Sequence, residues 1–346
     1  MPEPADVALD ATYSIGNELS GVGVYSREIL FGLAAAHPDA TFRFCYRPNR
    51  FLRSWREKLP SNAHRSLLQE PILPRRADLF HGLNQRLPTE RLRRTVTTFH
   101  DLFVLTGEYS TPEFRRRFAD QARRAASESD LIIAVSQFTA TQVEQLLGVE
   151  PSRLRVIHHG VRIPPLRSVP REKIILHVGA IQKRKNVSRL IQAFESAAPP
   201  DWRLILAGSA GFGAEEIIEQ IAASPARPRI SVLGYVSADA LEDWYSRVMM
   251  LAFPSLDEGF GIPILEAMAA GVPVITSNRS ALPEVAGDAA ILINPESTDE
   301  LTAAINQLAT DDQLREDLKL KGLARVQQCC WEKAVSQTWN VYRELL

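Results

Sequence analysis

The sequence contains no run of the roughly 18 apolar residues that a helix needs to cross a bilayer. Its first residues, Met1–Asp6, lack the basic and apolar regions of a secretory signal peptide. Only three cysteines occur, Cys45, Cys329 and Cys330, and their positions match no metal-binding spacing. Together these absences predict a soluble protein in a reducing cytoplasm, where disulfides are rare.

Three further motifs are missing or incomplete. No Asp-x-Asp sequence is present, so a divalent metal ion held on a diphosphate by paired aspartates is not expected. The segment Gly21-Val-Gly23 lacks the third glycine and the preceding strand of a dinucleotide-binding loop. The segment from Gly208 to Gly213 lacks the Lys-Ser/Thr pair of an NTPase phosphate loop. Neither hydride transfer nor ATP hydrolysis is therefore favoured.

The chain has the length and the pattern of a two-domain α/β protein. Its 346 residues exceed what one hydrophobic core usually supports. Short apolar runs alternate with helical patterns, as in parallel sheets covered on both faces. The segment Val161–Pro170 contains three prolines and interrupts this pattern. We therefore expect two Rossmann-like, doubly wound domains, at 1–163 and 171–330. The predicted strands are Val7–Asp10, Phe42–Cys45, Thr95–Phe99, Leu131–Val135, Ile174–Val178, Arg203–Ala207, Ile230–Leu233, Met249–Phe253 and Val272–Ile275.

A basic segment lies within a nearly neutral chain. The net charge is −1, yet residues 40–100 contain 13 Lys and Arg residues against four Asp and Glu residues. Such a segment favours an anionic partner, although a solvated basic surface without function is an equal alternative. Because no nucleic-acid-binding motif accompanies it, an anionic membrane surface or a pyrophosphate-bearing acceptor fits better than nucleic acid.

Two glutamates eight positions apart, Glu258 and Glu266, flank a glycine-rich turn into a helix. Gly259 and Gly261 allow the backbone to come close to a ligand, and Pro263 suits the first turn of a helix. The amides of that turn would face an anion. The two carboxylates could then bind different ends of one nucleotide-sugar, although an ordinary βα unit with surface glutamates has the same spacing.

This segment resembles the Glu-x7-Glu signature of the retaining glycosyltransferases of family 4, which have the GT-B fold of two Rossmann-like domains facing a central cleft. The resemblance extends over nearly the whole chain, from Gly21 to the C-terminus. The other matching segments, in chain order, are Gly21–Tyr25, Thr98–Leu102, Ile133–Phe138, Val156–Val161, Val178–Asn186, Ser277–Val285 and Gly287–Ala290.

The resemblance implies roles for residues of the second half, which would bind the donor. Arg184 and Lys185 would hold the donor diphosphate and stabilise its departure, although such a pair taken alone is usually surface charge. Glu266 would bind the ribose hydroxyls and Glu258 the donor sugar near its anomeric carbon. The backbone of Gly259-Phe260-Gly261 would contact sugar and phosphate. From its position, Asn186 is predicted to be the N-cap of the next helix.

The first half would bind the acceptor and complete the donor site. His100 follows a predicted strand, and the resemblance implies that it contacts the donor sugar, although a lone histidine there is more often a packed residue. Gly21 and Gly23, before a helix expected near Tyr25, would let acceptor and phosphate approach the backbone. Ser20 and Val24 depart from the glycine and the basic residue that are common in the family, which weakens this last prediction.

The final segment, about 331–346, has apolar or aromatic residues at helical spacing. By the same resemblance, this helix returns to the N-terminal domain. The alternative is a helix packed on the C-terminal domain.

The expected function is that of a retaining glycosyltransferase that moves a hexose to a glycan or lipid-linked acceptor in cell-surface polysaccharide synthesis. Thr98–Phe103 and Tyr109–Phe114 resemble bacterial mannosyltransferases, so the expected donor is GDP-mannose. The alternatives are a UDP-sugar donor for glucosyl or N-acetylglucosaminyl transfer, an epimerase or phosphorylase of the same fold, and a noncatalytic sugar-nucleotide-binding partner of a glycan-assembly complex. No metal or other cofactor is expected, and the protein could contact the inner face of the membrane peripherally. Same-face attack is favoured over a covalent intermediate.

Overall fold

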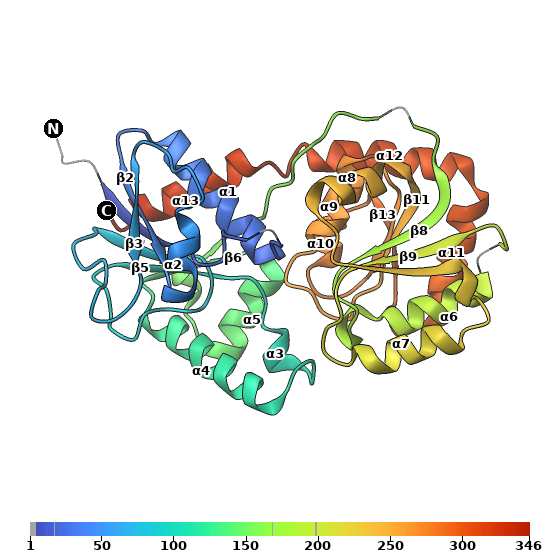
Figure 1. The fold of residues 1–346 in the computed structure, drawn as a ribbon, viewed down its shortest axis with the longest axis horizontal. Helices are drawn as coiled ribbons and strands as arrows, with labels where there is room; N and C mark the ends of the chain where they lie inside the picture. Colours follow the sequence, from blue (N-terminus) through green and yellow to red (C-terminus); the bar gives the residue numbers. More distant parts are fainter. Residues whose placement is uncertain (1–4, 17, 168, 198) are drawn as a thin grey trace. The chain divides into compact units, whose positions relative to one another are not determined.

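The computed structural model describes residues 5–16, 18–167, 169–197 and 199–346. The chain divides into two compact units (Figure 1): unit 1 comprises the chain up to Gly160 together with Cys330–Leu346, and unit 2 is Val161–Cys329. Each unit contains one parallel sheet, which confirms the predicted α/β class. Within the described ranges, no helix combines the length and the hydropathy that a bilayer crossing requires.

Unit 1 has a seven-stranded sheet in the order β3-β2-β1-β4-β5-β6-β7, with every neighbouring pair parallel. The central strands are buried, as both faces of the sheet are covered by helices. The strands are β1 Asp6–Asp10, β2 Thr41–Tyr46, β3 Ala63–Leu67, β4 Leu79–Gly82, β5 Thr95–Phe99, β6 Leu131–Ala134 and β7 Leu154–Val156. The α-helices are α1 Gly21–Ala36, α2 Pro48–Ser54, α3 Phe103–Thr106, α4 Pro112–Glu128, α5 Gln137–Leu147 and α13 Trp331–Arg343.

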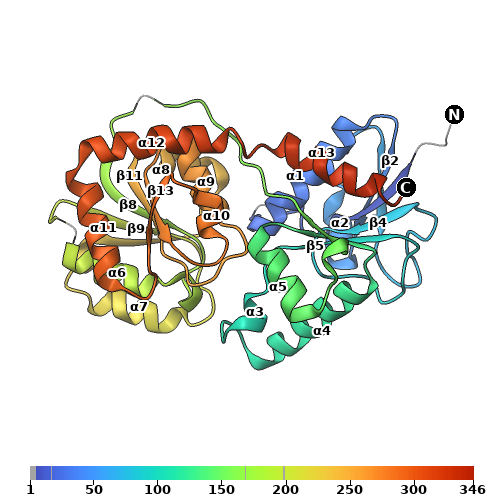
Figure 2. The same cartoon turned by 180° about the vertical axis from the view of Figure 1, so that it is seen from behind.

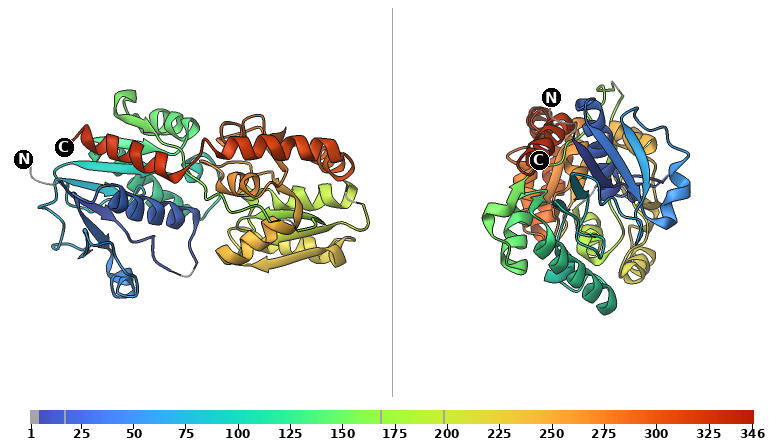
Figure 3. Two further views of the ribbon diagram at one scale, coloured as in Figure 1. Left: turned by 90° about the horizontal axis from the view of Figure 1, so that it is seen from above. Right: turned by 90° about the vertical axis from the view of Figure 1, so that its left-hand side faces the viewer.

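Helix α13 lies beside α1, although the two are far apart in the sequence (Figures 2 and 3). The ring of Trp339 stacks on His37, with centroids 3.9 Å apart. The hydroxyl of Tyr342 lies 2.6 Å from Nδ1 of the buried His81 on β4. Aromatic packing and this buried hydrogen bond attach the last helix to the sheet of unit 1.

Unit 2 has a six-stranded parallel sheet in the order β10-β9-β8-β11-β12-β13. The predicted strand at Val272–Ile275 begins two residues later, after Pro273. The strands are β8 Glu172–Val178, β9 Arg203–Ala207, β10 Ile230–Gly234, β11 Val248–Phe253, β12 Val274–Ser277 and β13 Ala290–Ile293. The α-helices are α6 Val187–Ala197, α7 Ala214–Ala223, α8 Ala238–Arg247, α9 Ile262–Ala269, α10 Leu282–Ala286, α11 Thr298–Thr310 and α12 Asp312–Val326.

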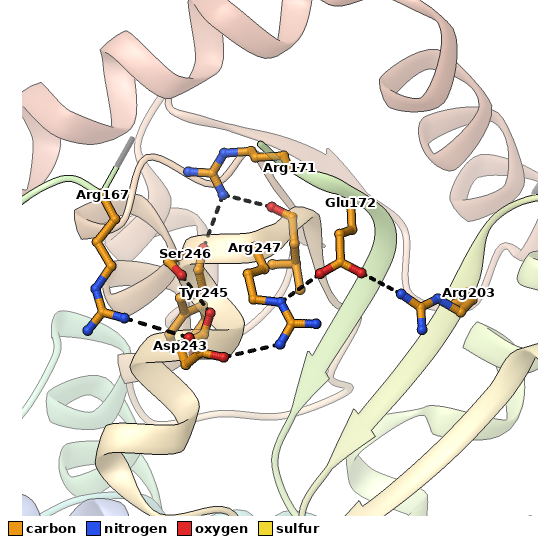
Figure 4. A network of polar contacts seen from close by, with 9 residues as sticks. Arg167, Arg171, Glu172, Arg203, Asp243, Tyr245, Ser246 and Arg247 are labelled. Atoms are coloured by element: carbon orange, nitrogen blue, oxygen red, sulfur yellow. Dashed lines mark hydrogen bonds and ion pairs between the residues drawn. The ribbon is translucent and has the colours of Figure 1, made fainter. Parts of the chain in front are cut away.

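A polar network covers the amino-terminal edge of the sheet in unit 2 (Figure 4). Glu172, the first residue of β8, accepts hydrogen bonds of 2.6 Å from both Arg203 and Arg247. The guanidinium of Arg171 donates to four main-chain carbonyls, those of Tyr245, Val248, Ala270 and Gly271. The network therefore connects the starts of three strands to helix α8 and to the turn that follows α9.

Candidate active site

Three charged side chains come together at the carboxyl-terminal edge of the sheet in unit 2. Nη1 of Arg184 lies 2.9 Å from Oε2 of Glu258, and Nζ of Lys185 lies 2.5 Å from Oε1 of the same carboxylate. The side chains of Arg184, Lys185 and Glu258 are only 9%, 11% and 10% exposed, respectively. The ammonium of Lys185 also lies 4.8 Å from the ring centroid of Phe253, the last residue of β11. With two cations and one carboxylate, this charge cluster carries one net positive charge.

The cluster keeps Glu258 ionised. Burial by itself raises the pKa of the carboxyl group, but the charges of Arg184 and Lys185 outweigh it and lower the pKa to about 2. At neutral pH the cluster is therefore two cations held on one carboxylate. An incoming diphosphate could bind the same two cations, as its oxygens accept the same kind of charge-assisted hydrogen bond.

Main-chain contacts hold the loops of the cluster in place. The amide of Glu258 donates to Oγ of Ser280 at 3.1 Å, and the amide of Ala281 donates to the carbonyl of Glu258 at 3.2 Å. The amide of Leu256 donates to the carbonyl of Arg184 at 2.8 Å. Ser280 has a φ of +55°, a conformation that is uncommon for a residue other than glycine. Contacts with the loop after β12 thus hold the backbone of Glu258 in place at this edge of the sheet.

Asn186 directly precedes helix α6, as predicted, and its carbonyl accepts from the amide of Leu190 at 3.2 Å, but its side chain bonds elsewhere than to the first amides of the helix. Asn186 has a φ of +59°, in the left-handed region that asparagine tolerates better than most residues. Its side-chain amide donates to the carbonyls of Pro254 and Pro295, at 3.0 and 2.7 Å. The residue therefore connects the loop that carries Arg184 and Lys185 to the loops after β11 and β13.

The glycine-rich turn leads into helix α9 as the sequence predicts. Gly261 directly precedes the helix with a φ of +109°, and a Cβ there would lie 2.7 Å from Cδ2 of Leu282. A side chain at this position is therefore excluded both by conformation and by space. Phe260 is buried, and Pro263 lies in the first turn of α9.

Glu266 lies on α9 and has a partner that the sequence analysis did not identify. The hydroxyl of Tyr245, on α8, donates to Oε2 of Glu266 at 3.0 Å. Burial raises the pKa of Glu266, although this hydrogen bond opposes the shift. Tyr245 is itself buried and orients one carboxylate oxygen. No local motif marks Tyr245, because the two residues are 21 positions apart and meet only through the fold.

His177 is a second residue that the sequence analysis did not identify. It is fully buried on β8, and its Nδ1 donates to the carbonyl of Ala252 at 3.0 Å. Its Nε2 is buried and makes no hydrogen bond to any described residue. Burial lowers the pKa of His177 to about 4, and Lys185 contributes to this shift, so the imidazole is neutral at neutral pH.

His100 follows β5 in unit 1 and is also buried. Its Nε2 lies 2.9 Å from the carbonyl oxygen of Leu83, which can only accept, so Nε2 carries the hydrogen. Nδ1 is then an acceptor, which suits contact with a sugar hydroxyl. Burial lowers the pKa of His100 to about 4, so the ring is neutral. Tyr25 packs edge-on against His100 at 4.7 Å, and His159 stacks on it at 5.5 Å.

The prediction that Gly21 and Gly23 precede their helix is wrong, because α1 begins at Gly21. Ser20 is the N-cap, and its side chain accepts from the amide of Gly23 at 3.4 Å. A Cβ on Gly23 would lie 2.9 Å from the carbonyl oxygen of Tyr13. Gly23 therefore allows the loop after β1 to pack on the first turn of α1, and its amide is already used by the cap.

The predicted residues thus belong to two groups. Arg184, Lys185, Glu258, the turn Gly259–Gly261 and Glu266 lie in unit 2, whereas Gly21, Gly23 and His100 lie in unit 1. Among the described residues, no three His, Cys, Asp or Glu side chains are placed to hold a metal ion.

Comparison with known proteins identifies both halves of the chain. Residues 19–163 match the family model "Glycosyltransferase Family 4", and residues 163–325 match the model "Glycosyl transferases group 1". The O-antigen chain mannosyltransferase B of Escherichia coli is 30% identical, with 97% of this chain and 99% of that protein covered.

Solved structures share the fold. Sucrose-phosphate synthase from Thermosynechococcus elongatus superimposes with a TM-score of 0.81, at 21% identity and 99% coverage of both chains. Anabaena HepE in complex with UDP-glucose superimposes with a TM-score of 0.76, at 19% identity, covering 98% of this chain and 99% of that one.

Proposed function

The chain belongs to glycosyltransferase family 4 and is a hexosyltransferase of the GT-B fold, and we propose that it transfers mannose from GDP-mannose to a glycan or lipid-linked acceptor. The product would be part of a cell-surface polysaccharide. The observation that carries the choice of mannose is the full-length similarity to an O-antigen mannosyltransferase. A nucleotide-sugar donor is common to this proposal and to its alternatives.

The charge cluster supplies the positive charge that the leaving diphosphate requires during transfer. Negative charge develops on the diphosphate as the glycosidic bond breaks, and the cations of Arg184 and Lys185 are buried at one edge of the sheet to stabilise it. In this proposal the donor diphosphate takes these cations as partners, and Glu258 binds hydroxyls of the donor sugar. Glu266 binds the ribose, and Nδ1 of His100 accepts a hydrogen bond from the sugar.

We further propose that attack occurs on the same face from which the diphosphate leaves, with retention at the anomeric carbon. Before a donor binds, the carboxylate of Glu258 is held by two cations, and its pKa is about 2. The family resemblance gives this glutamate contact with the hydroxyls of the donor sugar. This supports a positioning role for Glu258 over a covalent intermediate. Trapping with a slow fluorinated donor followed by peptide mass spectrometry would test it, and a glycosylated Glu258 would contradict it.

Metal-independent transfer is part of the proposal, as two side-chain cations would replace a divalent ion on the diphosphate. Activity should persist in excess EDTA. Complete loss of activity that Mg²⁺ or Mn²⁺ restores would contradict this assignment of the leaving-group stabilisation.

Contact with an anionic membrane surface is also proposed. Leu52 and Trp55, on and just after helix α2, are 81% and 65% exposed, and Arg56 and Lys58 beside them are exposed cations. Exposed apolar and basic side chains together favour an interfacial position on anionic lipid. A Leu52→Ser, Trp55→Ser double variant should bind less to vesicles containing anionic lipid, with transfer to a water-soluble acceptor unchanged.

The donor is tested by a thermal-shift panel of GDP-, UDP- and ADP-sugars, as ligand binding raises the apparent melting temperature by mass action. GDP-mannose should give the largest shift and should support transfer, with the anomeric configuration read by NMR. The bound UDP-glucose of the HepE structure supports a UDP-sugar as the second candidate. A larger shift and faster turnover with UDP-glucose or UDP-N-acetylglucosamine would replace mannose in the proposal. Donor binding without transfer or hydrolysis would favour a noncatalytic partner.

A further inference from the structure

A cavity of about 400 Å³ in unit 1 is lined by three arginines and, within the described part of the chain, by no carboxylate. It lies at the carboxyl-terminal edge of the sheet, where the loops after β1, β2 and β4 meet. The side chains that matter for its chemistry are Thr12, Tyr13, Arg47, Asn49, Arg50 and Arg86. We propose that this cavity binds a phosphate or diphosphate group of the acceptor, an inference that rests on the proposed glycosyl transfer.

The arginines differ in their partners. Arg47 is 3.4 Å from the carboxylate of Asp10, which is buried, and it donates to the carbonyl of Arg86 at 3.1 Å. Nη1 of Arg86 donates to the hydroxyl of Tyr13 at 2.9 Å. Arg50 forms neither an ion pair nor a hydrogen bond through its side chain with any described residue. Among the described residues, therefore, two of the three guanidiniums have no carboxylate as an ion-pair partner.

This arrangement matches the charge of a diphosphate and offers the donor groups that bind one. Three guanidiniums and the single carboxylate of Asp10 leave a net charge of +2 around the cavity, and a diphosphate diester carries two negative charges. Guanidinium groups bind phosphate oxygens bidentately, which makes arginine the preferred residue for phosphate recognition. The side chain of Asn49, which is exposed and lines the same cavity, can donate a further hydrogen bond.

The position of the cavity fits an acceptor site. Carboxyl-terminal ends of parallel strands lie along one edge of a sheet, and β4 is the neighbour of β5, the strand that His100 follows. The loop after β4 lines the cavity through Arg86 and accepts the hydrogen bond of His100 through the carbonyl of Leu83. The cavity is distinct from the cluster of Arg184 and Lys185, which lies in unit 2.

A first experiment tests the cavity without using transfer. The full-length protein is treated with phenylglyoxal, which modifies accessible guanidinium groups, and each arginine is followed by mass spectrometry with and without inorganic pyrophosphate. Pyrophosphate should slow the modification of Arg50 and Arg86 but not that of Arg53, an exposed arginine of α2 that does not line the cavity. Equal protection of Arg53, or no protection of Arg50, would overturn the proposal.

A second experiment identifies the source of the anion. Two synthetic acceptors carry the same saccharide, one on an alkyl diphosphate and the other as a neutral alkyl glycoside. Arg50→Gln should raise KM for the diphosphate acceptor roughly tenfold or more, as a charge-assisted hydrogen bond is lost. KM for the neutral acceptor and for the donor should stay unchanged, and Arg50→Lys should recover part of the loss.

Arg53→Gln is the matched control, because it removes the same charge from the same helix. An equal rise of KM for both acceptors in Arg50→Gln, or the same effect in Arg53→Gln, would reduce the cavity to a nonspecific basic surface. Protection by pyrophosphate without any preference for the diphosphate acceptor would contradict the acceptor as its source. If the wild-type protein transfers no sugar from any donor, the proposed function fails, and the protection experiment still decides whether the cavity binds the anion.

Discussion

The two edges of the sheet in unit 2 both gather arginines and carboxylates, but they differ in exposure. At the amino-terminal edge, Glu172 pairs with Arg203 and Arg247, and these side chains are 35–50% exposed. At the carboxyl-terminal edge, Glu258 pairs with Arg184 and Lys185, and these are 9–11% exposed. Ion pairs between carboxylates and basic side chains are thus solvent-exposed at the amino-terminal edge and largely buried at the carboxyl-terminal edge.

This difference in exposure distinguishes a network that can only stabilise the fold from a cluster that can also stabilise a bound anion. Exposed ion pairs contribute about 0–1 kcal/mol each because water and salt screen them. Buried charges interact more strongly, and removing one partner leaves a costly unpaired charge. A buried cluster with an excess cation can therefore bind and stabilise an anion that forms next to it. The amino-terminal edge can lose a charge with little consequence, and the carboxyl-terminal edge cannot.

The largest effect is expected for Arg184→Ala and Lys185→Ala. Each should lose roughly 2–4 kcal/mol of transition-state stabilisation, the scale of one lost charge-stabilising donor. Because Glu258 keeps one cation in either variant, unit 2 should still fold. Arg247→Ala is the control from the exposed edge and should leave kcat/KM almost unchanged. Wild-type turnover by Arg184→Ala or Lys185→Ala would remove that residue from the site.

Lowering the pH should reduce the stability contributed by the buried ion pairs of Glu258 more than that contributed by the exposed ion pairs of Glu172. The pKa of Glu258 is lowered from 4.5 to about 2, so between these values the unfolded chain binds more protons than the folded one. This contribution to stability, about 3 kcal/mol, is present above pH 4.5 and is lost as the pH falls toward 2. Urea unfolding across this range should show a steeper loss for the wild type than for Glu258→Gln, whereas Glu172→Gln should follow the wild type. Parallel curves for the wild type and Glu258→Gln would contradict the buried pairing.

Glu258→Gln should mainly lower kcat, by a factor on the order of 10² or more. A carboxylate beside the anomeric centre helps to stabilise positive charge that develops there, and its neutral amide cannot. Steady-state kinetics with the donor varied would separate kcat from KM. Normal turnover by this variant would leave the segment around Glu258 as a structural βα turn.

Glu266→Gln should show a smaller change than Glu258→Gln and should act mainly on nucleotide binding. A hydrogen bond to ribose is present in the ground state and in the transition state, so its loss appears largely in KM. Tyr245→Phe removes the hydroxyl that orients Glu266 and should weaken binding in the same direction by less. Calorimetry with free GDP and UDP would measure both, and full nucleotide affinity in Glu266→Gln would contradict the ribose contact.

The sequence predicted those parts of the fold that depend on local pattern. The runs Thr95–Phe99 and Arg203–Ala207 are strands with the predicted bounds, and apart from Arg203 their residues are buried. Continuous apolar or β-branched segments are typical of the interior of a parallel sheet. Strand β4 at Leu79–Gly82 was not predicted, because its four residues lie in a strongly basic segment. The start of α1 was placed too late, because the cap made by Ser20 outweighs the low helix propensity of two glycines.

The residue types needed for the chemistry can be read from the sequence: two adjacent cations, two glutamates across a glycine turn, and a histidine after a strand. Which of these side chains meet depends on the folded chain. Glu258 is bound by Arg184 and Lys185 because parallel strands bring the loops after β8 and β11 to one edge, although more than 70 residues separate them. The same geometry brings Tyr13, Arg47 and Arg86 around one cavity. Burial then sets the pKa of Glu258, because the free energy of a charge depends on the solvent and the partners that surround it, which only the folded chain supplies.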